Sequence, residues 1–371
     1  MKIIHCADLH LDSKLSAHLD KTKAKERRGE LLNTFTRLVR YASDNGVKAL
    51  LIAGDLFDTG SISKTTINTV MHAISENPDI NFYYLEGNHD NDTFTSHMDE
   101  LGWTEIPDNL KLFGDEWHTY CEADGQICIS GVELNSKNSG AALYSFETDA
   151  NIFNIVMLHG QESESSGKEK SEIINLNALR FKNIDYLALG HIHSYKKVSL
   201  DPRCTYCYPG CLEGRGFDEC GEHGFVLLDI DEEHRTYTHE FVPFAQRRLY
   251  EVIVDVSGLM STAQMVDTAR NRACAEGCNP ESMVKVVLNG EVDVECEKDI
   301  VYFEAQLKDE FYFIKVEDKT RLQINIDDYR LDESLKGEFV RQVLADENID
   351  EEDKMKVIRF GLQALAGEEI Q

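Results

Sequence analysis

The 371-residue sequence predicts an α/β fold with mixed sheets flanked by helices, followed by a small α+β domain and a helical C-terminal segment. Three observations support this prediction. Short apolar runs bounded by polar or turn-forming residues recur as far as residue 230, as buried strands do. Amphipathic helix patterns separate the first three runs, and such alternation is typical of α/β domains. After Gln246-Arg247-Arg248 the pattern changes to a shorter alternation of strands and helices.

Six apolar runs are expected to form buried strands, and they span residues 3–6, 49–53, 82–85, 152–158, 186–189 and 225–230. Between the first two, Leu31, Phe35 and Leu38 share one helical face, and Gly46 is a natural C-terminal stop. A second helix is expected to begin near Ser63. We therefore predict one large domain over residues 1–245.

The pattern after residue 246 predicts two further regions. Strands are expected at 250–256, 284–288 and within 311–325, with helices at 263–275 and 299–307. This gives a small α+β domain over residues 246–328. The last region, residues 329–371, contains two amphipathic helix patterns.

The charge balance is strongly acidic, with 38 Lys and Arg against 67 Asp and Glu and a formal net charge of −29. Such acidity argues against a protein that simply coats nucleic acid, which needs a basic face. It leaves open a nucleic-acid enzyme whose metal ions supply local positive charge. No run reaches the length of a membrane helix, and the N-terminus has no leader pattern, so a cytoplasmic protein without membrane contact is expected.

The ten cysteines could suggest a disulfide framework. In a long chain with a sizeable core, free thiols are the expectation instead. One cluster leaves an alternative open, because Cys204-x-x-Cys207 has the spacing of a metal knuckle, with Cys211 and Cys220 nearby.

Five polar clusters follow the expected strands where each strand stops. Ligands in open α/β sheets bind outside the carboxyl ends of the strands, so these clusters are expected to converge. The clusters are Asp8-x-His10, Gly54-Asp55-Leu56-Phe57-Asp58, Gly87-Asn88-His89-Asp90, His159-Gly160 and Gly190-His191-Ile192-His193.

The pooled side chains predict a site for two divalent metal ions. Imidazole nitrogens and carboxylate oxygens suit manganese, iron and zinc. A carboxylate can bridge two ions about 3.5 to 4 Å apart, and Asp55 is the candidate because Gly54 permits close approach. Such a pair activates water for in-line displacement at phosphorus.

The full set of clusters resembles the calcineurin-like metallophosphoesterase superfamily, and within it the SbcD-type DNA repair nucleases. Three segments over residues 1–245 carry the closer resemblance: Ala7-Asp8-Leu9-His10-Leu11-Asp12, Gly54-Asp55-Leu56-Phe57-Asp58-Thr59-Gly60 and Tyr208-Pro209-Gly210-Cys211-Leu212-Glu213. At Cys211 those nucleases usually carry Ser. The resemblance implies a metallophosphoesterase β-sandwich and a two-metal-dependent hydrolase, with Mn²⁺ expected and Fe²⁺, Mg²⁺ or Zn²⁺ as alternatives.

The resemblance also implies a role for each site residue. Asp8, His10, Asp55 and His193 would hold one metal ion, and Asp55, Asn88, His159 and His191 the other. His89 would face the substrate and protonate the leaving oxygen, with Asp58 orienting it.

The substrate expected from the resemblance is DNA, cleaved as an exonuclease or endonuclease would cleave it. Candidate phosphate contacts are Arg215, Arg247 and Arg248, and the α+β domain would grip DNA. The C-terminal helices would dock an SbcC-like coiled-coil ATPase, and a homodimer is implied as well. Two alternatives stay open: a phosphodiesterase or phosphatase for small nucleotides or phosphoproteins, and a non-catalytic metal-binding subunit of such an ATPase complex.

Overall fold

The computed structural model describes residues 1–15, 19–58, 62–90, 106–135, 138–164, 173–293, 296–323 and 326–366. The chain forms two compact units, Met1–Arg248 and Leu249–Gln371. Each unit has its own apolar core. Of the helices in these described ranges, none is long and apolar enough to cross a membrane.

The strands of the first unit are β1 (Lys2–Cys6), β2 (Ala49–Ala53), β3 (Asn81–Leu85), β4 (Leu110–Leu112), β5 (His118–Glu122), β6 (Ile127–Gly131), β7 (Phe153–His159), β8 (Gln161–Ser163), β9 (Ile173–Asn175), β10 (Tyr186–Gly190), β11 (Lys196–Ser199), β12 (Thr205–Tyr208), β13 (Gly224–Asp231) and β14 (Thr236–Pro243). Its helices are α1 (Lys21–Asp44), α2 (Lys64–Ser75) and α4 (Ser139–Ser145), with short 3₁₀ turns at Ala123–Gly125 and Leu176–Ala178.

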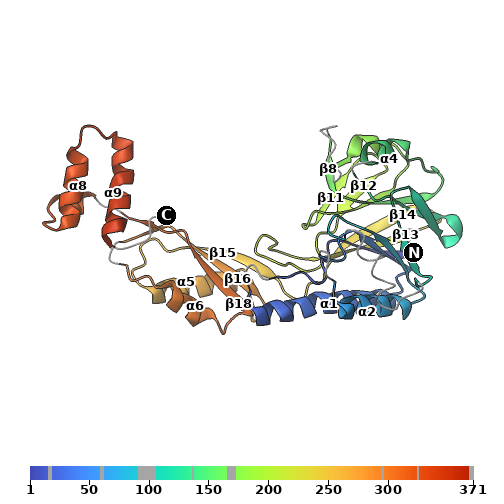
Figure 1. Ribbon diagram of the computed structural model, residues 1–371, viewed down its shortest axis with the longest axis horizontal. Helices are drawn as coiled ribbons and strands as arrows, with labels where there is room; N and C mark the ends of the chain where they lie inside the picture. The colour runs from blue at the N-terminus through green and yellow to red at the C-terminus, as the bar shows by residue number, and fades with distance from the viewer. Residues whose placement is uncertain are drawn as a thin grey trace. The chain divides into compact units, whose positions relative to one another are not determined.

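Two six-stranded mixed sheets form the centre of this unit, which confirms the predicted α/β class. The first sheet runs β14-β13-β1-β2-β3-β4, and β1, β2, β3 and β4 are parallel. The second runs β11-β12-β10-β7-β6-β5, with β12, β10, β7 and β6 parallel. Helices α1 and α2 cover the outer face of the first sheet, and α4 lies beyond the second (Figure 1). The result is a sandwich of two sheets between helices.

Three apolar clusters hold the layers together. Leu51 of the first sheet meets Ile129 and Ile155 of the second in the cluster between the sheets. On the outer side of the first sheet, Leu50 packs with Phe35 of α1. Alternation of side chains along a strand explains why neighbouring residues serve different clusters.

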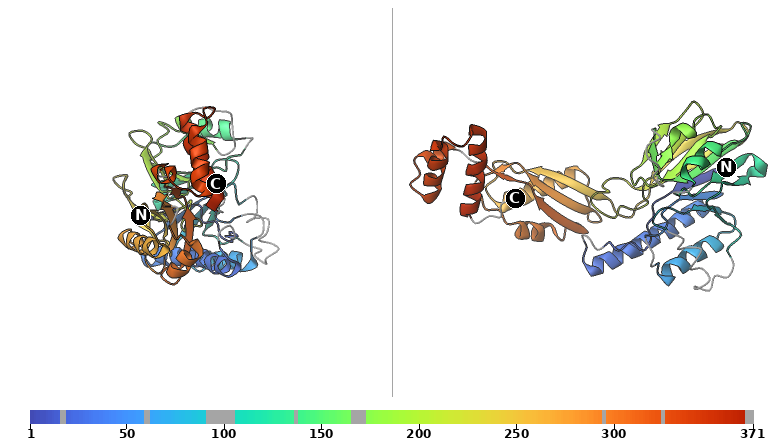
Figure 2. Two further views of the ribbon diagram at one scale, coloured as in Figure 1. Left: turned by 90° about the vertical axis from the view of Figure 1, so that its left-hand side faces the viewer. Right: turned by 45° about the horizontal axis from the view of Figure 1, so that its top comes forward.

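Helix α1 begins earlier than its apolar pattern alone predicts. Asp20 caps it by accepting hydrogen bonds from the backbone N–H groups of Thr22 and Lys23, 2.8 and 2.9 Å away. Ser63 caps α2 in the same way, as expected from the sequence. The two helices lie side by side (Figure 2).

The second unit contains a small α+β layer and a pair of helices. Parallel strands β15, β16 and β18 form a sheet, whose buried valines pack with Met265 of α5 and Phe303 of α6. Further on, α8 and α9 pack through Val340, Ile358 and Leu362. The elements are β15 (Leu249–Asp255), α5 (Thr262–Ala275), β16 (Met283–Asn289), β17 (Glu291–Val292), α6 (Ile300–Leu307), β18 (Phe313–Asp318), β19 (Arg321–Leu322), α7 (Ile326–Arg330), α8 (Leu335–Ala345) and α9 (Glu351–Ala366).

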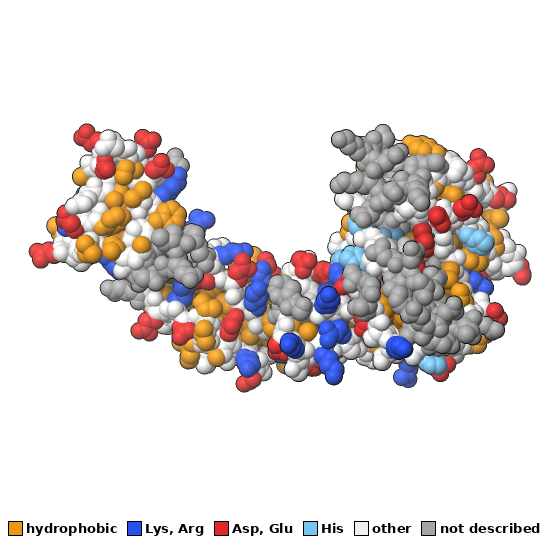
Figure 3. Space-filling model, viewed as in Figure 1, with side chains coloured by type: hydrophobic (Ala, Val, Ile, Leu, Met, Phe, Trp, Pro, Cys, Tyr) orange, Lys and Arg blue, Asp and Glu red, His pale blue; other side chains and the backbone are white. Residues whose placement is uncertain are grey.

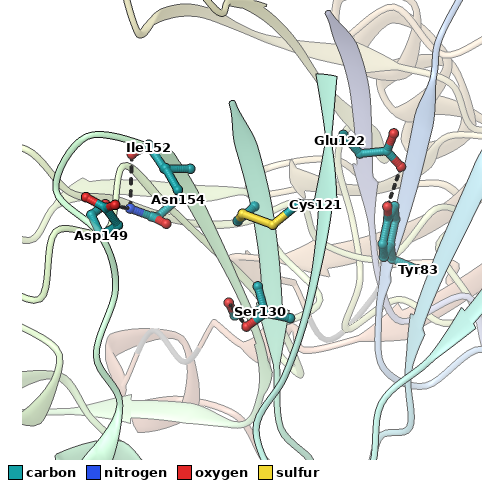
Figure 4. Close-up of a disulfide and its surroundings, with 9 residues drawn as sticks. Tyr83, Cys121, Glu122, Ser130, Asp149, Ile152 and Asn154 are labelled. Carbon is teal, nitrogen blue, oxygen red and sulfur yellow. Dashed lines mark hydrogen bonds between the residues drawn. A yellow bond between two sulfur atoms is a disulfide. The ribbon is translucent and has the colours of Figure 1, made fainter. Parts of the chain in front are cut away.

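The cysteines correct one expectation. Cys121 of β5 and Cys128 of β6 lie directly opposite each other in an antiparallel pair and form a disulfide (Figure 4). The expectation of free thiols is therefore wrong for these two residues. The eight others are not disulfide-bonded.

The zinc alternative at Cys204-x-x-Cys207 is also wrong. Cys204 belongs to the core outside the second sheet, whereas Cys207 belongs to the core between the sheets. Cys211 is buried and Cys220 is exposed. Because the two knuckle cysteines lie in different cores, they cannot hold one ion together.

Candidate metal centre

The site forms where strands β1, β2, β3, β7 and β10 end. Backbone hydrogen bonds join the first two loops, since Asp8 N–H donates to Gly54 O at 3.1 Å and His10 N–H donates to Asp55 O at 2.9 Å. Asp8, His10 and Asp55 all have left-handed backbone angles, with φ of 53°, 45° and 51°. Residues other than glycine rarely adopt these angles, and such strain is concentrated at functional sites.

Glycines allow the loops to approach each other. A Cβ atom added to Gly54, whose φ is 91°, would overlap the His159 ring, and one added to Gly87 would overlap the Asp55 carboxylate. At Gly190 it would overlap the carbonyl of Ala53. These positions therefore require glycine so that the side chains of neighbouring loops can meet.

One group of side chains combines Asp8, His10 and His193, whose ligand atoms lie within 4.8 Å of one another. The Nε2 atoms of His10 and His193 are 3.2 Å apart. Asp8 also accepts the His191 backbone N–H at 2.9 Å. Burial raises the pKa of Asp8, an effect that its neighbouring histidines oppose.

A second group combines Asp8, Asp55 and His159 within the same limit. His159 Nε2 lies 3.0 Å from Asn88 Oδ1 and 3.3 Å from Asp55 Oδ2. Asn88 Oδ1 is in turn 3.2 Å from Nδ1 of His191. Burial opposes the ionisation of Asp55, but the hydrogen bond and charge of His159 outweigh it and lower its pKa to about 2.

The orientation of the His159 and His193 rings suits metal ligands. His159 Nδ1 lies 2.9 Å from Ala53 O, and His193 Nδ1 lies 2.7 Å from a Glu219 oxygen. Because both partners only accept, each ring carries a proton on Nδ1 and turns Nε2 toward the site. Burial opposes the protonation of His159, but the hydrogen bond and charge of Asp55 outweigh it and raise the pKa of His159 to about 9, so a metal ion would displace a proton from Nε2. Imidazole nitrogens and carboxylate oxygens gathered at about 3 Å from one another are ligand types that divalent cations accept. Asp55 belongs to the second group, where its Oδ2 is 3.3 Å from His159 Nε2, and the same oxygen is 3.8 Å from His10 Nε2 of the first group.

His89 lies beside these groups and is 40% exposed. Its Nδ1 is 3.1 Å from Asp58 Oδ1, and its backbone N–H donates to Asp55 Oδ1 at 2.8 Å. The His10 ring, whose Nδ1 lies 3.7 Å from Asp58 Oδ1, holds the pKa of Asp58 well below its usual range. The structure therefore pairs His89 with an ionised carboxylate, as expected for a proton donor facing solvent.

The candidate phosphate contacts differ in their placement. Arg215 lies at the site, where its Nη2 is 2.9 Å from Glu219 Oε1. Arg248 is on the surface and pairs with Glu222 at 3.1 Å. Arg247, however, is buried and bound to Glu30 at 2.6 Å, so it is not available to substrate and we withdraw it as a contact.

Two further residues contact the site: the sequence placed Asp90 in a polar cluster without a catalytic or metal role, and it did not single out Glu219. Asp90 is buried and accepts the backbone N–H groups of Phe57 and Gly87 at 2.8 and 2.9 Å, which ties two site loops together. Its position at the end of the Gly-Asn-His-Asp cluster is the sequence feature that marks it as close to the site. Glu219 binds His193, and no sequence pattern marks it. Thr59 and Gly60 of the second motif lie outside the described residues.

Comparisons with known proteins agree with this chemistry. A family model described as calcineurin-like phosphoesterase matches residues 1–195. The chain is 28% identical to the uncharacterized metallophosphoesterase YhaO of Bacillus subtilis over 314 residues, 78% of this chain and 72% of that protein.

Two further relatives have names that refer to DNA or to a nuclease. The DNA double-strand break repair protein Mre11 of Methanosarcina acetivorans is 24% identical over 309 residues, which cover 79% of this chain and 46% of the relative. The SbcD component of the nuclease SbcCD of Escherichia coli is 24% identical over 271 residues, which cover 62% of this chain and 64% of the relative.

Proposed function

Because the chain belongs to the calcineurin-like phosphoesterase family, a family of metal-dependent hydrolases, we propose that it hydrolyses phosphodiester bonds of DNA with two metal ions. The observation that carries the proposal is the pair of ligand groups that share Asp8, with Asp55 in the second group and His89 beside them. The resemblance stated from the motifs is confirmed at the level of the family.

In this proposal Asp8, His10, Asp55 and His193 hold one ion, and Asp55, Asn88, His159 and His191 hold the other. Two bound divalent ions, with Mn²⁺ proposed, supply Lewis acidity toward a phosphoryl oxygen and lower the pKa of water. His89 donates a proton from Nε2 to the leaving oxygen, because its Nδ1 is taken by Asp58. The carboxylate of Asp58 orients this ring and stabilises its protonated form.

The names of two relatives and one charged surface favour DNA over a small ester. Of the eight charged residues between positions 14 and 28, six are basic, although the chain carries a net charge of −29. Lys21, Lys25 and Arg28 share one side of α1 at helical spacing, and Arg28 donates to Lys14 O at 3.2 Å. Lys14 follows the turn that Ser13 N–H closes on His10 O, at 3.1 Å. This basic stripe beside the site would attract a polyanion.

Partners are proposed for the second unit. Leu335, Met355 and Phe360 on α8 and α9 are 70%, 36% and 42% exposed, which suits docking of an SbcC-like coiled-coil ATPase. Acidic side chains are scattered over both units on the face in Figure 3, so affinity for DNA should depend on a partner and on salt. A homodimer belongs to the same proposal.

Cleavage of linear single- and double-stranded DNA with Mn²⁺ tests the proposal. We expect Asp55→Ala to abolish cleavage and His89→Asn to lower kcat by about 10² to 10⁴-fold. Exposed Asp79→Ala and His72→Asn serve as matched controls and should retain wild-type rates. Full activity in Asp55→Ala would refute the metal mechanism.

The same assay separates the alternatives. Cleavage of bis-p-nitrophenyl phosphate or nucleotides, with DNA left intact, would favour the small-substrate phosphodiesterase. Failure to cleave any of these with Mn²⁺, Fe²⁺, Mg²⁺ or Zn²⁺, with and without an ATPase partner, would favour the non-catalytic role in an ATPase complex.

A further inference from the structure

Glu219 lies on the turn between β12 and β13 and contacts the outer ring nitrogen of His193, the one that faces away from the other candidate ligands. Its Oε1 is 2.7 Å from His193 Nδ1, and its side chain is only 6% exposed. A buried carboxylate normally needs several donors to offset its desolvation. The turn provides them, and they fix the carboxylate in one orientation.

Both oxygens of the Glu219 carboxylate are occupied. Oε2 accepts the backbone N–H of Arg215 at 2.7 Å, and Oε1 accepts the guanidinium Nη2 of Arg215 at 2.9 Å together with His193 Nδ1–H. Arg215 Nη2 also lies 3.2 Å from His193 Nδ1. The Glu219 carboxylate oxygen can only accept, so its 2.7 Å contact requires a proton on His193 Nδ1 that points to Glu219.

The backbone of Glu219 is held as firmly as its side chain. Its N–H donates to Gly216 O at 2.9 Å, and its carbonyl accepts His223 Nε2–H at 2.7 Å. The opposite ring nitrogen of His223 lies 3.2 Å from Cys211 Sγ. The hydrogen bond from His223 therefore fixes the Glu219 carbonyl. Gly214 lets the chain pass close to that carbonyl, since a Cβ added there would lie 2.9 Å from Glu219 O.

We propose that Glu219 is a positioning residue that keeps the proton of His193 on Nδ1 and so sets the affinity of one of the two metal sites. This inference rests on the proposed function for its metal ions. It goes beyond the proposed function because it predicts that one metal site, and not the other, depends on Glu219. His159 is oriented by a backbone carbonyl, that of Ala53, whereas His193 depends on a side chain that can be exchanged. Partners of this kind typically change metal affinity about 10- to 100-fold.

The first test measures Mn²⁺ binding to the full chain by calorimetry. In Glu219→Ala we expect one of two binding steps to weaken about 10- to 100-fold while the other is unchanged. Glu219→Gln keeps an acceptor oxygen for His193 and should restore most of that affinity. Glu222→Ala, three residues away and exposed, is the matched control and should match wild type within about twofold.

Nitrogen NMR of the His193 ring provides a readout that a merely structural role would not move. We expect the Nδ1–H form in wild type and Glu219→Gln, and a mixture of both tautomers in Glu219→Ala, with the urea midpoint recorded for each variant. Unchanged Mn²⁺ affinities in Glu219→Ala, or equal weakening of both steps, would overturn the inference. So would an unchanged tautomer. These readouts decide it whether or not the chain cleaves DNA.

Discussion

Replacing Arg27 of α1 by Met should destabilise the first unit by about 3 to 5 kcal/mol. The Arg27 side chain is 1% exposed, and its guanidinium donates to Glu30 at 2.5 Å, to Glu213 at 3.3 Å and to Gly214 O at 2.9 Å. Arg247 still neutralises Glu30 in the variant. Glu213, whose side chain is 1% exposed, would lose its cation and keep only the neutral hydrogen bonds from Thr34 and the Gln246 N–H.

The expected loss of stability follows from this difference between Glu30, which keeps a cation, and Glu213, which does not. Met retains most of the apolar stem, so the loss comes mainly from an uncompensated buried carboxylate, which typically costs several kcal/mol. Urea unfolding followed by tryptophan fluorescence reports the first unit alone, because both tryptophans, Trp103 and Trp117, belong to it. Arg28→Met, on the next residue, is the control and should change the unfolding free energy by no more than about 0.5 kcal/mol. A loss below about 1 kcal/mol in Arg27→Met would refute the reasoning.

Three further predictions concern other parts of the molecule. Burial raises the pKa of Glu133 to about 7 from its usual 4.5, so the folded state holds a proton that the unfolded state releases. Wild type should therefore lose stability relative to Glu133→Gln as the pH rises from 4.5 to about 7, and a flat difference between their unfolding free energies would contradict this. The denatured, unreduced chain should react with eight equivalents of a thiol reagent, and with ten after reduction; ten before reduction would exclude the Cys121–Cys128 bond. Mn²⁺ at a hundred times its Kd should stabilise the first unit by about 2.7 kcal/mol per site, and Asp55→Ala should lose this gain.

Elements with a continuous apolar run were predictable from the sequence, but the buried strands β6 and β12, whose short segments mix apolar and polar residues, were not. The 152–158 and 186–189 runs became β7 and β10 because both faces of those strands are buried, which leaves a continuous apolar pattern. Strands β5, β11 and β14 escaped prediction. They lie at sheet edges and carry many exposed side chains, so their sequences lack the apolar run.

The convergence of the candidate site residues was predictable because each follows a strand that the apolar pattern reveals. Asp55 and His159 are examples, since a strand end fixes where the next side chain emerges. Glu219 has no such marker, because an irregular turn brings it to His193 across 26 positions of sequence. Arg247 shows the converse, since its basic character suggested phosphate binding but packing gave it Glu30 as its partner. The Cys121–Cys128 pairing depended on the register of β5 and β6, which the sequence did not reveal.

Counting the manganese ions that the chain binds tests the central claim most directly. Equilibrium dialysis with elemental analysis should find two Mn²⁺ per wild-type chain and two in His89→Asn. In Asp55→Ala both ions should be lost if Asp55 serves both sites, as proposed. Two ions retained in Asp55→Ala, or a single ion in wild type, would contradict the shared two-metal centre.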